Sequence, residues 1–388
     1  MSQYLHHHLK MHHLHFTEVN ELYVSLSLQA FSLGLIGIFV PIFIYTLGFS
    51  VATLATFFVV TFFSSIITYP VSAKLTSLVG PKHIIALSYI ILFVYVLLLF
   101  LLPAKNQLIY PTAVAGGVGA GMFWLARHID FATVTSGKNT MKKLSTLLIF
   151  YIIAQATAPF IGGVIATNFG IGYGFLAASI GLLIAIYPLL RTPEPIVPRK
   201  THIRPMRTAP ARHLIANFAM NSQTTVGLYT WPLFIYLTVG TYQNVGLIAS
   251  ASLMLSVILL HTVGQFGTEK KSEKILRLGI ISRALTHLIR RFANSFPLAF
   301  GTNILGDVTD VLVSVPYTAR FYNGARKYDI PAYLTDMEIA GGLGKISIWI
   351  VLMAVSLQFG LKTGLMVSFI QAALMMPLIK LIEPIHKK

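Results

Sequence analysis

The sequence contains no cysteine and few charged residues for its length. Without thiols, the chain forms no disulfide bond and no thiolate metal site. Charged residues make up 11% of the 388 positions, whereas soluble proteins average about 25%. Hydrophobic residues make up 55%. This balance excludes an ordinary soluble domain and favours a protein that is solvated by lipid.

The motifs of common enzyme classes are also missing. The sequence has no P-loop, so ATP is not predicted as an energy source, and it has neither Gly-x-Ser-x-Gly nor His-Glu-x-x-His. An intramembrane aspartyl hydrolase is disfavoured, because Ile304 interrupts the Gly-x-Gly-Asp pattern and Asp307 and Asp310 share one helix. The sequence therefore predicts a protein that is not an enzyme and uses no cofactor.

Long apolar runs dominate the chain. Because lipid supplies no hydrogen-bond partner, a spanning segment must be a helix or part of a closed barrel. The runs are close to the 20 or so residues of a spanning helix, not the roughly ten alternating residues of a barrel strand. The pattern predicts an all-α polytopic membrane protein with 12 transmembrane helices. These lie near 22–47, 52–78, 83–103, 108–130, 144–167, 170–190, 213–238, 244–266, 276–294, 297–321, 333–357 and 361–382.

Basic residues outnumber acidic ones by 29 to 12, for a net charge of +17. All but six of the basic residues fall on one side of the predicted spans. The exceptions are Lys105, Arg283, Arg290, Arg291, Lys345 and Lys362. Lys and Arg mark cytoplasmic loops, so both termini are predicted to be cytoplasmic, in a bacterial-type inner or plasma membrane. The charge favours contact with anionic lipid, and no nucleic-acid partner is predicted.

A short phrase occurs twice, which indicates an internal repeat. Pro41-Ile42-Phe43-Ile44-Tyr45 returns as Pro232-Leu233-Phe234-Ile235-Tyr236, about half the chain later. Trp124-x-x-Arg127 and Tyr317-x-x-Arg320 repeat at nearly the same offset. Duplicated halves are common in transporters.

The repeat divides the chain into four parts. We expect a His-rich cytoplasmic tail at 1–20, a six-helix bundle at 21–190, a basic Pro-rich cytoplasmic linker at 191–212 and a second six-helix bundle at 213–388. The proline density favours an extended linker. The two bundles are predicted to be related by a pseudo-two-fold axis.

The six-plus-six arrangement resembles the major facilitator superfamily (MFS) from about Glu21 to the C-terminus. The loop after the second span resembles the family motif Gly-x-Leu-x-Asp-Arg-x-Gly-Arg-Arg, in which Leu75, Gly80 and Lys82 match. Ser77 stands at the acidic position, which is a departure from the pattern. The resemblance implies a gating loop at these residues.

The fifth predicted span resembles the Gly-x-x-x-Gly-Pro-x-x-Gly-Gly motif associated with antiporters of that family. Pro159, Gly162 and Gly163 match, and Ala154 and Ala158 replace the two early glycines. The resemblance implies an exporter or antiporter. The alternative is tight helix packing alone, because small residues four apart let two helices approach closely.

Three charges are predicted near the midplane of the membrane. With a rise of about 1.5 Å per residue, Asp307, Asp310 and Lys345 lie about 16–21 Å from the cytoplasmic ends of their spans. It costs free energy to keep two neighbouring carboxylates and one lysine all ionised within the membrane, so one carboxyl is expected to bind a proton. A proton-coupling site and a structural ion pair with Lys345 both remain open.

Neutral polar residues at helical spacing favour a substrate cavity. In the resembled family, spans one, four, seven and ten line it, which implies Gln29, Trp124, Asn217 and Asn221 as lining residues. Their neutral side chains favour an uncharged or cationic solute.

The histidines of the tail are the remaining candidate for metal binding. His8 and His12 lie one helical turn apart, but a basic membrane anchor or an added sequence explains them as well, and no metal site is predicted.

These features predict a proton-coupled secondary active transporter of a small organic solute that works by alternating access. The expected partners are the solute, protons and membrane lipids, and we expect a monomer. The alternatives are a lipid flippase or a non-transporting receptor on the same fold, since a fold alone does not determine function.

Overall fold

The computed structural model describes residues 18–134, 140–191, 194, 205–265 and 269–383. Most of the predicted His-rich tail and most of the predicted linker lie outside the described residues. Within these ranges all regular structure is helical, in the order α1(Glu18–Gly34), η1(Gly37–Phe39), α2(Val40–Thr46), α3(Val51–Val79), α4(Pro81–Leu101), η2(Asn106–Leu108), α5(Ile109–Val134), α6(Thr140–Asn168), α7(Ile171–Leu189), α8(Ala211–Thr225), η3(Val226–Thr230), α9(Trp231–Val239), α10(Tyr242–Gln265), α11(Glu269–Ile289), η4(Arg290–Phe292), α12(Phe296–Lys327), α13(Ile330–Phe359), α14(Leu361–Met375) and η5(Met376–Leu381).

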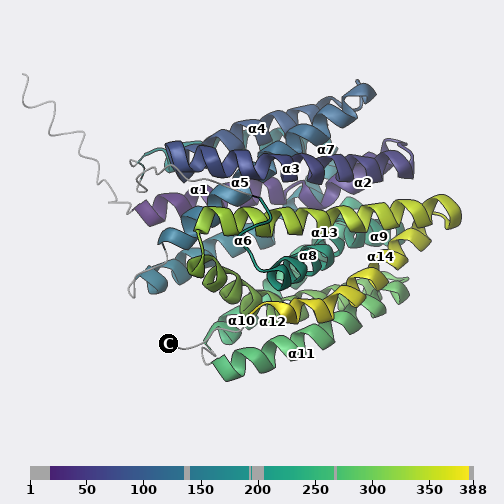
Figure 1. Ribbon diagram of the computed structural model, residues 1–388. Helices are drawn as coiled ribbons and strands as arrows, with labels where there is room; N and C mark the ends of the chain where they lie inside the picture. The colour runs from purple at the N-terminus through teal and green to yellow at the C-terminus, as the bar shows by residue number, and fades with distance from the viewer. Residues whose placement is uncertain (1–17, 135–139, 192–193, 195–204, 266–268, 384–388) are drawn as a thin grey trace, which may run out of the picture.

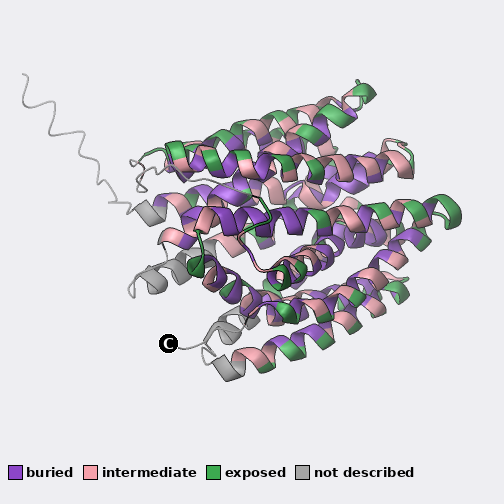
Figure 2. Cartoon of the chain, in the orientation of Figure 1, coloured by how far each residue is buried: buried purple, intermediate pink, exposed green. Residues whose placement is uncertain are grey.

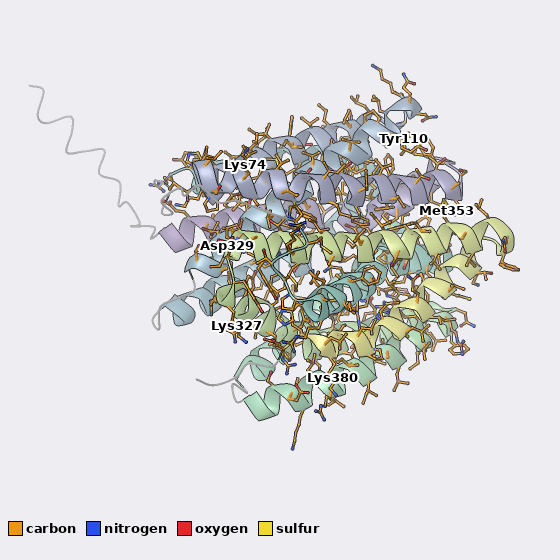
Figure 3. All side chains as sticks on the ribbon, viewed as in Figure 1. Lys74, Tyr110, Lys327, Asp329, Met353 and Lys380 are labelled. Carbon is orange, nitrogen blue, oxygen red and sulfur yellow. The ribbon has the colours of Figure 1, made fainter. Side chains whose placement is uncertain are left out.

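The long helices lie side by side in one bundle, and both ends of the chain are at the same end of it (Figure 1). We call this the terminal end and the opposite one the distal end. Lys74, Lys327 and Asp329 lie toward the terminal end, whereas Tyr110 and Met353 lie toward the distal end (Figure 3). This placement follows from an even number of passes through the bundle.

Eight helical stretches are long and apolar enough to cross a membrane, among the described residues. Together with the family reported below, they show an integral, multi-pass, all-helical membrane protein. The predicted spans 144–167, 213–238, 244–266 and 276–294 are helical over most of their described residues, and they are not among these eight stretches. Helix α12, which corresponds to the tenth predicted span, continues to Lys327, beyond the predicted end at residue 321. The backbone hydrogen bonds of a helix do not stop where its apolar run does.

The repeated phrase marks a break in the first long helix of each half. A 3₁₀ turn precedes α2, and a π-helical turn, η3, precedes α9. Pro41 and Pro232 lack a backbone N–H, and their rings disturb the preceding helical turn, which accounts for both interruptions. The two copies contact each other, because α2 packs against α9 and η1 against η3.

Helices α1–α7 form what we call the N-terminal half, and α8–α14 the C-terminal half. The halves meet mainly where α3 packs on α13 and where α6 packs on α10. Small residues of the fifth predicted span permit close packing on both sides of α6. A Cβ at Gly163 would lie 2.6 Å from the carbonyl oxygen of Tyr242 in the C-terminal half, and a Cβ at Gly162 would overlap the carbonyl of Leu35 in the N-terminal half. The packing interpretation of this motif is therefore supported, and an antiporter role stays a prediction.

The outer surface of the bundle is apolar. Exposed positions follow the outer flanks of the bundle, including α4 and α11, while buried positions follow the interior (Figure 2). The exposed residues recur every three or four positions, at Leu87, Ile90, Val94 and Leu97 on α4 and at Leu278, Ile281, Leu285 and Ile289 on α11. Such stripes are the expected contact with lipid, because soluble monomers rarely expose continuous apolar patches of this kind.

The segment that joins the two halves is hydrogen-bonded to α13 just before α8 begins. Asp336 on α13 is fully buried and accepts backbone hydrogen bonds from Thr208 at 2.7 Å, from Ala209 at 2.9 Å and from Met206. A buried carboxylate needs such partners, since an unpaired charge in the interior is costly. The start of the C-terminal half is thereby fixed against α13.

We predict that Gly162→Ala destabilises the protein by about 1–3 kcal/mol, because the methyl group overpacks the α1–α6 contact. The melting temperature of the detergent-purified protein is therefore expected to fall. Gly301→Ala is the matched control, since nothing lies within 4 Å of a Cβ at that position. Equal melting temperatures for the two variants would contradict the close packing described here.

Candidate functional site

A cavity of about 300 Å³ lies between the two halves. This is the lower end of the range of ligand pockets, about 300–1,000 Å³. Helices α1, α3, α4, α5 and α6 supply most of the wall, and the C-terminal half closes it with Leu228, Tyr229, Leu253 and Lys345. The cavity is therefore composite, and any movement of one half against the other changes its shape.

Two of the four predicted cavity residues line it. Gln29 and Trp124 belong to the wall. Asn217 and Asn221 are not among the lining residues. Asn217 accepts a hydrogen bond from the Tyr317 hydroxyl at 2.6 Å and donates to the Met337 carbonyl at 2.5 Å, so it joins α8, α12 and α13 inside the C-terminal half.

Lys345 lies at the cavity wall, away from the two aspartates. Its Nζ is 5.6 Å from the centroid of the Phe62 ring. In the described part of the chain, no Asp or Glu oxygen forms an ion pair within 4 Å of this ammonium group. The expected ion pair between Lys345 and Asp307 or Asp310 is therefore wrong, because the side chains leave their helices in different directions.

Arg127 lies directly behind the aromatic wall. Its Cζ is 5.0 Å from the Trp124 ring centroid and 5.1 Å from that of Tyr151, and both rings line the cavity. A guanidinium stacked on rings in this way is held by cation–π attraction. Together with Lys345, it places a second positive charge close to the cavity.

A polar contact crosses between the halves beside the cavity. His128 Nε2 on α5 lies 3.4 Å from Glu338 Oε1 on α13, and its Nδ1 lies 2.6 Å from the Tyr322 hydroxyl on α12. Glu338 was not a candidate from the sequence, because it lies close to the start of its span. The signal that could have found it is the pair of opposite charges near the ends of the fourth and eleventh spans.

The two aspartates belong to a charged cluster inside the C-terminal half. Asp310 Oδ1 lies 3.4 Å from the Arg283 guanidinium and accepts a hydrogen bond from Gln223 at 3.3 Å. Asp307 accepts hydrogen bonds from Ser252 and, at 3.3 Å, from Asn303. The charged partner of Asp310 is thus an arginine of α11, whereas Asp307 is held by neutral hydrogen-bond donors.

The basic residues of α11 complete this cluster. Arg290 is buried over the Trp231 ring, at 4.8 Å from its centroid, and lies 3.3 Å from His287 Nδ1. Gly306 makes room for both guanidinium groups, because a Cβ there would lie 2.9 Å from Arg290 and 3.2 Å from Arg283. Helix α11 thus turns its charged face inward and its apolar face outward.

The predicted gating loop holds an acidic residue from elsewhere in the chain. Gly80 ends α3 with φ +90°, which only glycine adopts readily, and Leu75 and Lys82 flank it. The Glu194 carboxylate accepts the Lys82 backbone N–H at 3.0 Å, and it lies where a Cβ at Gly80 would be. Glu194 therefore brings a negative charge to the N-terminus of α4, where the helix dipole favours it.

We predict that Arg283→Gln destabilises the protein by about 1–3 kcal/mol, because the half-buried Asp310 loses its cationic partner and the Gln223 amide and Gly306 carbonyl lose a donor. Thermal unfolding in detergent measures the loss. Arg291→Gln, at an exposed position near the same helix, is the control. Addition of Asp310→Asn to Arg283→Gln is expected to recover part of the stability, and strict additivity of the two changes would contradict the pairing.

Long apolar helices around a composite cavity define a membrane protein with the architecture of a solute carrier. The sequence matches the family model described as Major Facilitator Superfamily over residues 22–315. The chain therefore belongs to the major facilitator superfamily. No curated protein matches the sequence significantly.

Solved structures share the fold. The human organic anion transporter MFSD10 (TETRAN) is similar with 10% identity and a TM-score of 0.68, covering 94% of this chain and 98% of that one. The nucleoside transporter NupG is similar with 12% identity and a TM-score of 0.64, covering 94% and 97%. A bacterial homologue of the iron transporter ferroportin, in its inward-facing state, is similar with 13% identity and a TM-score of 0.65, covering 94% and 98%. At these identities the similarity shows the fold.

Proposed function

We propose that the protein is a secondary active transporter that moves a small organic solute by alternating access. The observation that carries this proposal is the cavity shared by the two halves, which is lined by Gln29 and Trp124 on one side and by Tyr229 and Lys345 on the other. A site built from both halves is released when either half rocks against the other. A small molecule of the fitting size would be bound at this point.

Contacts on both sides of the cavity support alternating access. Toward the terminal end, the Phe131 and Tyr322 rings meet across the halves with centroids 4.7 Å apart, beside the His128 contact. Toward the distal end, the Thr46 hydroxyl lies 3.1 Å from the Tyr242 hydroxyl. Each end therefore has its own contact between the halves, and one of the two has to separate in each state of the alternating-access cycle.

We further propose that all twelve predicted segments cross the membrane as two six-helix bundles. The arrangement of side chains around α11 supports this count. Arg283, His287 and the neighbouring Arg290 contact partners inside the bundle, whereas Leu278 and Ile281 are exposed on its outer surface. Intramembrane charges are tolerated when they point into the bundle. Both termini would then be cytoplasmic, and the expectation that the protein is not an enzyme remains part of the same proposal.

Proton coupling is proposed at Asp307 and Asp310. Asp310 contacts Gln223 and Arg283, and Gln223 lies three residues before the π-helical turn η3, whose Tyr229 lines the cavity. A proton on Asp310 would remove its attraction to Arg283 and loosen the hold on this turn. Such π-helical turns occur frequently at functional sites. Because of the motif in the fifth predicted span, we also propose that the protein is an exporter or antiporter.

Alternating access predicts that a covalent link at either end stops transport. The chain has no cysteine of its own, so cysteine pairs can be introduced without background. The pairs Phe131→Cys with Tyr322→Cys, and Thr46→Cys with Tyr242→Cys, are cross-linked with a short bis-maleimide in proteoliposomes. Uptake of a labelled solute panel is measured before and after. Full transport with either link in place would contradict the mechanism.

Proton coupling predicts a separation of driven transport from exchange. Asp310→Asn is expected to abolish acceleration by an imposed pH gradient, because it removes the proton site, and to retain solute exchange at equal pH. Asp329→Asn is the matched control, since Asp329 caps α13 through the Ala332 N–H at 3.0 Å and asparagine caps a helix equally well. An Asp310→Asn protein that still responds to the gradient would sink the assignment.

A further inference from the structure

We propose that the cavity binds a small organic anion, a carboxylate with an aromatic or apolar body, and that Lys345 is the residue that selects it. This proposal rests on the proposed transport function and names its substrate class. The sequence favoured an uncharged or cationic solute because the predicted lining residues are neutral. In the structure Asp310 pairs with Arg283, Asp307 accepts hydrogen bonds from Ser252 and Asn303, and Lys345 lies at the cavity wall.

The charge of the cavity is positive. Among the described lining residues, Lys345 alone carries a charge, and no carboxylate belongs to the wall. Glu338 attracts this ammonium group, and it lies seven residues earlier on α13, about 10 Å along the helix axis. Glu338 is itself engaged with His128 at 3.4 Å. An ammonium group in an apolar site without an ion pair is costly, and a bound carboxylate would relieve that cost.

The rest of the wall fits the body of such a molecule. Most of it is aromatic or aliphatic, and Trp124, which belongs to the wall, is 38% exposed. Arg127, stacked on the far side of Trp124, reinforces attraction for a negative group without entering the cavity. Gln29 and Gln155 add amide donors for the second carboxylate oxygen. A polar anchor at one point and an apolar wall elsewhere is the usual design of a small-molecule site.

The volume restricts the size. About 300 Å³ accommodates a single ring with a short acidic chain and not a nucleotide or a lipid. Polyanions are disfavoured as well, because one ammonium in the wall and one guanidinium behind it neutralise one or two charges. The proposed substrate class is therefore a monocarboxylate of about one ring.

The test uses matched probes on the full-length protein in detergent. Benzoate and phenylacetate are compared with benzamide, phenylacetamide and benzylamine, by thermal shift and by isothermal titration calorimetry. The carboxylates are expected to raise the melting temperature and to bind at least about tenfold more tightly than the amides and the amine. The amides and the amine cannot form the charge-assisted hydrogen bond with Lys345 that a carboxylate forms. Equal or tighter binding of the amides or the amine would overturn the proposal.

Variants assign the effect to Lys345. Lys345→Gln is expected to weaken carboxylate binding at least about tenfold, whereas Lys345→Arg retains most of it because the charge remains. Lys362→Gln is the control, an exposed lysine at the start of α14. Unchanged binding by a folded Lys345→Gln protein would overturn the proposal, and its melting temperature without ligand reports the fold.

The same probes separate the two hypotheses. If proteoliposomes move another class of solute and carboxylates do not bind, this inference fails and transport stands. If carboxylates bind through Lys345 and no solute of the panel crosses the membrane, the proposed transport function is contradicted. The assignment of carboxylates as ligands of the cavity is then retained.

Discussion

Hydrocarbon offers no hydrogen-bond partner, so each polar group within the bundle has to find one inside the protein. Helix α11 shows this constraint most directly. Its Arg283 meets Asp310 and Gln223, and Arg290 in the following turn η4 lies over Trp231, while exposed leucines and isoleucines of α11 face outward. The packing of α11 against α12 is consistent with these contacts. The charges that look out of place in an apolar segment are the reason that the segment packs where it does.

The cavity is governed by the same rule, with a different outcome. Polar side chains that find partners, such as Asn217 with Tyr317, become part of the scaffold. Lys345, which finds no carboxylate within reach among the described residues, stays at the cavity wall. Scaffold and site are thus distinguished by whether the protein satisfies its own polar groups. Gln29 and Gln155 belong to the second group, since both amides line the cavity.

The sequence was informative about the helices and poor about the direction in which their side chains point. Length and apolarity predicted the helices, their order and the all-helical fold, and the motif residues Gly162 and Gly163 predicted close packing that the structure contains. The rise of a helix also placed Asp310 and Lys345 at similar depth. Which way a side chain points around the axis could not be predicted, because helices that are apolar all round carry no periodic signal. The pairing of Lys345 was therefore wrong, and Glu338 and His128 were missed.

The contact between the two copies of the repeated phrase has a consequence for how the chain varies. Helices α2 and α9 contact each other, and a proline stands at the second position of each. Each copy is therefore part of the surface on which the other packs, as in an interface between like elements. A change in one copy alters one side of this contact and leaves the other side as it was, so we expect a change in one copy to require a compensating change in the other.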